Sequence, residues 1–126
     1  MAEAVLLNSF RQRIAAHMAG KGTLAPIGYM AFGDGGHNDD LTAKPALPEA
    51  TGLANELLRK PIDVITQEDP FSVTGKGSVD MNELVGVALS EAALIDTDGN
   101  VIGIKNFSPK VKESDESYDV SIKLRF

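Results

Sequence analysis

The sequence contains no cysteine, no tryptophan and only two histidines. The lack of cysteine excludes disulfides, thiolate metal ligands and cysteine nucleophiles. Basic residues are in the minority, since 12 Lys and Arg stand against 18 Asp and Glu, for a net charge of −6. A protein that binds a phosphate backbone needs a basic face, so this balance argues against nucleic-acid partners. Because histidines are few and cysteine is absent, we expect no enzyme and no bound cofactor.

A long apolar run is also missing. The longest weakly polar stretch, Leu84–Ile95, contains Ser90 and Glu91. It is much shorter than the roughly 20 apolar residues needed to span a bilayer. The N-terminus lacks the basic start and apolar core of a secretory signal. These absences predict a protein that is made in a cytoplasm and has no membrane partner.

The length and composition predict one small domain over residues 1–126, with 43% hydrophobic and 24% charged residues. Apolar residues at steps of three and four predict a helix over residues 2–19 that ends at Gly20. A second helix is predicted from Pro48 to about residue 60. Its Leu53 and Leu57 would face the core, and Pro61 would end it.

Most of the remaining chain predicts strands, with a glycine-rich exposed loop over residues 33–48. The strands are expected over residues 27–32, 62–66, 71–74, 78–81, 85–95 and 101–107. Asp98-Gly99 predicts a hairpin turn between the last two. Residues 118–126 alternate strictly between apolar and polar, which is typical of a half-buried strand. The order of elements predicts an α+β fold, with two helices packed on a mainly antiparallel β-sheet.

Short motifs suggest a phosphate loop and a calcium loop, but in each case an ordinary turn explains the residues better. Gly20-Lys21-Gly22-Thr23 and Gly75-Lys76-Gly77-Ser78 resemble phosphate loops, but neither has Gly-Lys followed directly by Ser or Thr. Asp96, Asp98 and Asn100 resemble the start of a calcium loop. That loop requires glycine at its sixth position and glutamate at its twelfth, and neither requirement is met.

The most polar cluster lies in the loop over residues 33–40. His37 could ligate a metal together with Asp34, Asp39 and Asp40, so a small-ligand or metal-binding module is the alternative function. A hydrolase would need a pocket that converges on His37, although no nucleophile is placed beside this histidine by sequence.

Glu91 is unusual because it lies inside the apolar run that forms the predicted strand 85–95. A buried carboxylate without partners is costly, so Glu91 should be paired, at a bulge or at an interface. Arg59, Lys60 and Lys105 are its possible ion-pair partners. An edge or surface position is the other interpretation.

Four segments together resemble the N-terminal domain of bacteriophage tail fibre proteins, the tail-collar fibre family. They are Ile27–Gly35, Leu53–Ile62, Leu89–Lys105, and Phe107–Lys110 with the final strand. The opening helix also matches the family's usual start. Ala93 departs from the family's usual glycine.

The resemblance implies a virion structural protein with other phage tail subunits as partners. Such a domain attaches a tail fibre to the baseplate of a phage or prophage tail, and the fibres are usually trimers. It also implies fold-defining and non-catalytic roles for eight residues of the pattern: Gly33, Asp34, Gly35, Arg59, Pro61, Glu91, Asp96 and Gly99. The family usually continues into a shaft beyond the position of Phe126. A shortened fibre and a short standalone tail protein both remain open on this point.

Overall fold

The structure is a computed structural model that describes residues 4–126, so the part of the first predicted helix before residue 4 lies outside it. It contains one helix and eight strands in this region. They are β1 (Val5–Leu6), α1 (Asn8–Met18), β2 (Ile27–Gly33), β3 (Glu56–Pro61), β4 (Val64–Thr66), β5 (Ser72–Val79), β6 (Ala88–Asp96), β7 (Val101–Val111) and β8 (Tyr118–Arg125).

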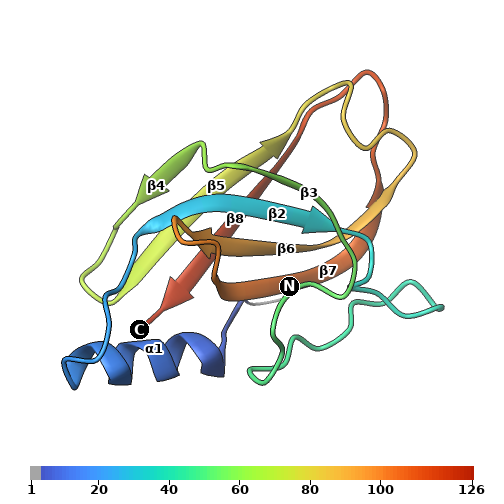
Figure 1. Cartoon of the computed structure of the whole chain (residues 1–126). Coiled ribbons are helices and arrows are strands. Elements are labelled where there is room, and N and C mark those ends of the chain that lie inside the picture. Colours follow the sequence, from blue (N-terminus) through green and yellow to red (C-terminus); the bar gives the residue numbers. More distant parts are fainter. Residues whose placement is uncertain (1–3) are drawn as a thin grey trace.

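The strands form two antiparallel sheets that face each other (Figure 1). The larger sheet has five strands in the order β1-β7-β6-β2-β3, and the smaller has three in the order β4-β5-β8. Helix α1 lies beneath one end of this sandwich, next to the C-terminus (Figure 1). There the Phe10 ring meets the Phe126 ring edge to face, with 6.0 Å between their centroids.

The predicted fold class is therefore wrong, because the protein is a mainly β sandwich with one helix in place of two helices packed on a sheet. The predicted second helix is a loop that leads into β3. Leucine, glutamate, arginine and lysine all favour helices, but intrinsic propensity is weak and tertiary contacts override it. Here Met30↔Lys60 and Phe32↔Leu58 pair across β2 and β3, so the end of the segment is an edge strand of the sheet.

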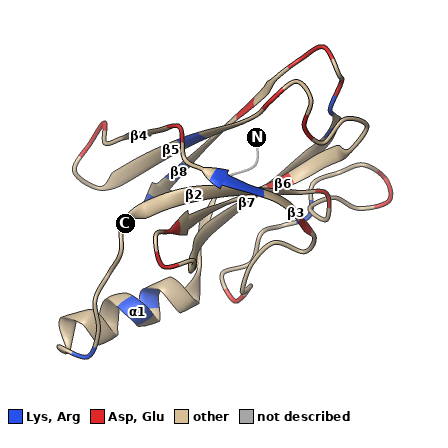
Figure 2. Cartoon of the chain, turned by 45° about the horizontal axis from the view of Figure 1, so that its top comes forward, with Lys and Arg blue, Asp and Glu red and all other residues tan. Residues whose placement is uncertain are grey.

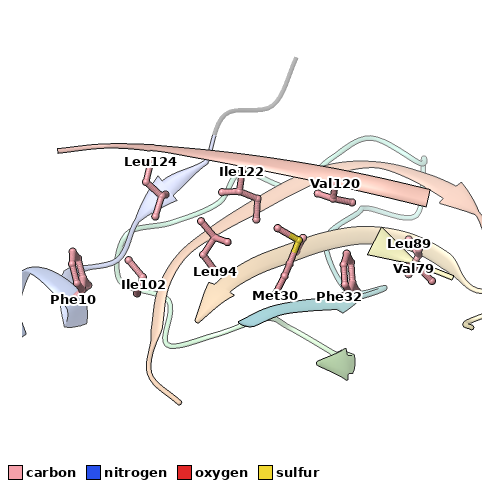
Figure 3. Packing of buried hydrophobic residues seen from close by; sticks show 11 residues of the cluster. Phe10, Met30, Phe32, Val79, Leu89, Leu94, Ile102, Val120, Ile122 and Leu124 are labelled. Carbon is pink, nitrogen blue, oxygen red and sulfur yellow. The ribbon is translucent and has the colours of Figure 1, made fainter. Parts of the chain in front are cut away.

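The five-stranded sheet is buried on both faces. On the inner face, apolar side chains of β2 and β6 point toward those of β8, as Figure 3 shows for Met30, Leu94 and Ile122. On the outer face, a second apolar cluster contains Ala31, Ala93 and Ile95, and Ala46, Ala50 and Leu53 pack against it. These last three belong to the long connection between β2 and β3. The connection 34–55 thus forms a third layer over the sheet.

The patterns with the strongest periodicity are confirmed. In β8, Val120, Ile122 and Leu124 are buried and alternate with more exposed neighbours. Strands β6 and β7 form the predicted hairpin, and Gly99 in its turn has φ +91°. A left-handed φ costs little only for glycine, so Gly99 suits this position.

Strand β5 is continuous where the sequence predicts two short strands around Gly75–Gly77. The two glycines lie against the inner face of the larger sheet. A Cβ at Gly75 would lie 2.6 Å from Leu94 Cδ2, and one at Gly77 would lie 2.8 Å from Met30 Sδ. The glycines therefore allow the two sheets to approach closely and do not mark a turn.

Helix α1 begins at Asn8, later than predicted, because Val5 and Leu6 pair with Ile104 and Gly103 of β7. No helix among residues 4–126 has the length and apolar character needed to cross a membrane.

Candidate functional site

Glu91 holds the long connection 34–55 to the outer face of the sheet. Its side chain is almost completely buried. The carboxylate accepts hydrogen bonds from three backbone N–H groups, those of Gly35 (2.9 Å), Ala54 (2.8 Å) and Asn55 (2.8 Å). Hydrogen bonds to a charged acceptor are stronger than neutral ones. A single side chain thus fastens both ends of the connection.

Ser90 contributes to the same attachment because of a β-bulge. The register between β6 and β7 shifts between Leu89 and Glu91, and such a bulge redirects side chains. The Ser90 hydroxyl accepts a hydrogen bond from the backbone N–H of Gly36 at 2.9 Å. It also lies 2.8 Å from His37 Nδ1. Neighbouring residues of β6 therefore both hold the start of the connection.

Asn106 completes the group on β7, directly opposite Glu91. Its amide Nδ2 donates to the carbonyl of Lys44 at 3.2 Å. Its Oδ1 is buried without a hydrogen-bond partner within the described part of the chain. A Cβ at Gly36 would lie 2.9 Å from this oxygen, so glycine is required for the close approach. Ser90, Glu91 and Asn106 are called the loop anchor below.

The partners of Glu91 differ from the predicted ones. Arg59 pairs with Glu56 at 2.8 Å, Lys60 pairs with Glu83 at 2.6 Å, and Lys105 donates to the carbonyl of Ser121. None of these three cations has an ion pair to Glu91 in residues 4–126. Three backbone donors take their place, since a buried carboxylate requires hydrogen bonds and not necessarily a countercharge.

The other residues of the family pattern fall into three places. Gly33, Asp34 and Gly35 lie beside Glu91, and Asp34 accepts a hydrogen bond from Asn55 Nδ2 at 2.7 Å. Arg59 and Pro61 lie on the edge strand β3. Asp96 and Gly99 lie in the β6–β7 turn, where the Asp96 carboxylate accepts from the N–H groups of Asp98 (3.0 Å) and Asn100 (2.9 Å). The structure thus brings four of the eight residues together.

The prediction that residues 33–48 form one exposed loop is wrong for its first part. Gly33 and Gly36 are buried, and His37 is half-buried. The following residues, Asn38 to Thr42, are exposed, as are Lys44, Pro45, Leu47 and Pro48. The cause is the loop anchor, which draws the glycines against β6 and β7.

The side chain of Asp40 binds within the loop itself. Asp40 Oδ1 accepts hydrogen bonds from the Thr42 hydroxyl at 2.5 Å and from the Thr42 N–H at 3.1 Å. These bonds, above all the one from the hydroxyl, hold the pKa of Asp40 below its ordinary value. Within residues 4–126, no three His, Asp or Glu side chains are grouped so as to hold a metal ion.

Replacing Thr42 by valine is expected to raise the pKa of Asp40, because the hydroxyl donor to its carboxylate is lost. The carboxylate form is the one stabilised in the folded protein. Its stabilisation is lost as the pH falls through the folded pKa, and this loss would begin at a higher pH in the variant. NMR titration of the Asp40 carboxyl carbon measures the shift. Thr51→Val, at an exposed position, is the control, and equal pKa values in the two variants would contradict the assignment.

Sequence reasoning missed the proximity of His37 to Ser90, although histidine and serine are common catalytic partners. The Ser90 side chain is fully buried, and its oxygen already accepts a backbone N–H. Two surface hollows lie elsewhere, and neither is lined by His37 or Ser90. The side chains of the loop anchor therefore bind backbone groups of the connection 34–55. The protein is a β-sandwich module in which the buried carboxylate of Glu91 holds this connection to the sheet.

The chain matches the family model described as "Phage tail-collar fibre protein, N-terminal" over residues 1–123. It belongs to this family, and its role is that of a structural component of a phage tail. The resemblance predicted from the four sequence segments is confirmed. Comparison with curated proteins and with solved structures gives no match.

Proposed function

We propose that the protein attaches a tail fibre to the baseplate of a phage or prophage tail through non-covalent protein–protein contacts. It does so as a homo-oligomer, most simply a trimer, that is assembled in the bacterial cytoplasm. The chain acts as one domain without catalytic activity. The family match over residues 1–123 is the observation that carries this proposal.

An apolar groove supports a function in protein contacts. It has a volume of about 310 Å³ and lies between α1, the segment before β2, strands β4 and β5, and the C-terminus. Leu24, Ile65 and Phe126 line it, and the exposed fraction of Phe126 is 53%. Phe71, whose exposed fraction is 72%, lies near this end, since its carbonyl accepts from the N–H of Phe126. Exposed apolar patches of this kind mark interaction sites.

The eight residues of the family pattern have structural roles under this proposal. The contacts of Glu91, Asp34 and Asp96 support this assignment, because each carboxylate accepts hydrogen bonds from the protein itself. None of them needs a ligand to be satisfied. The alternative of a ligand or metal module on the loop over residues 33–40 finds no supporting geometry among residues 4–126.

A capture experiment tests the attachment. The tagged full chain is incubated with each baseplate protein encoded in the same phage or prophage, and we expect stoichiometric capture of one of them. Phe71→Ser combined with Phe126→Ser should lower this capture, because the exposed apolar side chains are lost. Leu41→Ser with Leu47→Ser, two exposed positions in the connection 34–55, is the matched control. Capture of no baseplate protein by the folded chain would refute the attachment.

Light scattering after size exclusion tests the oligomer. A trimer has three times the monomer mass of 13.4 kDa. A single 13.4 kDa species over the whole working range of concentration would refute the oligomer and leave the attachment to the capture experiment.

A further inference from the structure

Positive charge is concentrated in one hollow of this acidic protein. The hollow has a volume of about 560 Å³ and lies between β1, the first turn of α1 and strand β8. Arg11, Lys105, Lys123 and Arg125 line it, against a single carboxylate, Glu68. The stretch from Ala4 to Leu6 gives it an apolar side. This group of residues is called the basic hollow.

The cations of the basic hollow are only partly neutralised. Lys123 lies 3.8 Å from Asp69, and Lys105 donates to the carbonyl of Ser121 at 3.2 Å. Arg11 and Arg125 have no carboxylate within 4.0 Å in residues 4–126. Four cations around one concave surface raise its positive potential and attract an acidic group.

The opposite end of the sandwich carries the complementary charge. The loops 80–87 and 111–117 meet there, since the N–H of Gly86 donates to the carbonyl of Lys112 at 2.8 Å. Figure 1 shows these loops at the end remote from α1 and the C-terminus, and Figure 2 shows their acidic stretches in red. This acidic tip contains five carboxylates: Asp80, Glu83, Glu113, Asp115 and Glu116.

The acidic tip also has the character of a contact surface. Three large apolar side chains are about half exposed on it, those of Met81, Val85 and Val111, with exposed fractions of 56%, 51% and 50%. The nearby Lys112 is buried, and its ammonium group donates to the carbonyls of Met81 and Glu113. Asp80 and Glu83 pair with Lys60, and Glu116 pairs with Lys110. Glu113 and Asp115 are exposed and have no ion pair in residues 4–126. These two carboxylates and the apolar groups beside them match the basic and apolar sides of the basic hollow.

We propose that the basic hollow binds the acidic tip of a second copy of this chain. This inference rests on the proposed homo-oligomer and names the surfaces that form it. One chain cannot make the contact with itself, because β8 leads away from the acidic tip and its cations Lys123 and Arg125 lie five and seven residues beyond Tyr118, or about 16 and 23 Å at the rise of a strand. Two different patches meet, so the contact is head-to-tail and can close into a ring.

Paired charge reversals in the full chain test the contact. The hollow variant carries Arg11→Glu and Arg125→Glu, and the tip variant carries Glu113→Lys and Asp115→Lys. All four positions are exposed, which keeps the effect on folding small. Each variant alone places like charges opposite each other, so we expect its self-association constant to fall about tenfold or more. Sedimentation velocity at about 50 and 500 mM salt measures it, and high salt should weaken the wild-type association.

Rescue makes the test specific. One chain with all four substitutions should restore association to within about threefold of wild type, because opposite charges face each other again at every contact. Lys21→Glu with Lys44→Glu is the control, since it changes the net charge as the hollow variant does at exposed positions outside the hollow.

The outcomes separate this inference from the proposed function. Association that neither reversal weakens, or that the chain with all four substitutions fails to restore, would overturn the head-to-tail contact and leave the oligomer standing. Equal weakening by the control would also overturn it. Loss of baseplate capture in the hollow variant with unchanged self-association would assign the hollow to a different tail protein and refute the second copy as its occupant.

Discussion

Glu91→Ala is expected to lower the free energy of unfolding by about 4 kcal/mol or more. The substitution removes the acceptor of three backbone N–H groups, those of Gly35, Ala54 and Asn55. Each buried donor left without a partner costs roughly 1–3 kcal/mol. A domain of this size is stable by only about 5–15 kcal/mol, so the loss is a large part of the total.

Glu91→Gln should cost less than alanine but remain clearly destabilising. The amide oxygen of glutamine can still accept a hydrogen bond. Its NH₂ group is a donor and would face a backbone N–H that donates to a carboxylate oxygen in the wild type. Urea unfolding followed by circular dichroism measures both variants. Glu49→Ala and Glu49→Gln, at an exposed position, are the matched controls. If Glu91→Ala lay within about 1 kcal/mol of its control, the anchoring role would be wrong.

The second large effect is expected for Gly33→Ala, at about 3 kcal/mol or more. A Cβ at this position would overlap the backbone carbonyl of Asn55, and it would lie 2.5 Å from Glu91 Oε2. The Asn55 carbonyl belongs to the backbone at the end of the connection 34–55, so it cannot move aside as a flexible side chain can. The loop would have to detach from Glu91 to make room.

Gly22→Ala is the control for this substitution, because nothing lies within 4 Å of its added Cβ and its φ is not positive. It should be neutral or slightly stabilising. Thermal unfolding of the two variants provides the comparison. Since Gly33→Ala and Glu91→Ala disrupt the same contact, the double variant should lose less than the sum of the two single losses. Strict additivity would argue against a shared mechanism.

Local patterns predicted the elements whose burial alternates regularly. The alternation of Tyr118, Val120 and Ile122 predicted β8, and Asp98-Gly99 predicted the β6–β7 hairpin. Each signal is contained within a few consecutive residues of the chain. No information from distant segments was needed to interpret them.

The errors arose where distant segments decide the structure. Residues 48–60 have helix-forming side chains, but the first part of this segment is a loop, and its end pairs with β2, for example Leu58 with Phe32, as the edge of the sheet. The sequence around Gly75 and Gly77 resembles a turn. In the structure these glycines leave space for the side chains of Leu94 and Met30 from the other sheet. Neither partner can be identified from the local sequence.

Glu91 illustrates both the strength and the limit of the prediction. Its position in an apolar run showed that it needed partners, and the structure places it at a bulge. The partners themselves are backbone N–H groups, which every residue except proline carries and which therefore leave no signature in a sequence. The same bulge brings Ser90 to His37, and this proximity had no sequence signal either.

The third layer over the sheet has a practical consequence for labelling. The connection 34–55 is fastened at its two ends by Glu91, whereas its exposed turn at Asn38–Leu41 lies away from the basic hollow and the acidic tip. Exposed turns of this kind tolerate insertions best. A short epitope or a fluorescent dye at this turn would report the location of the protein in intact virions while leaving both sheets undisturbed.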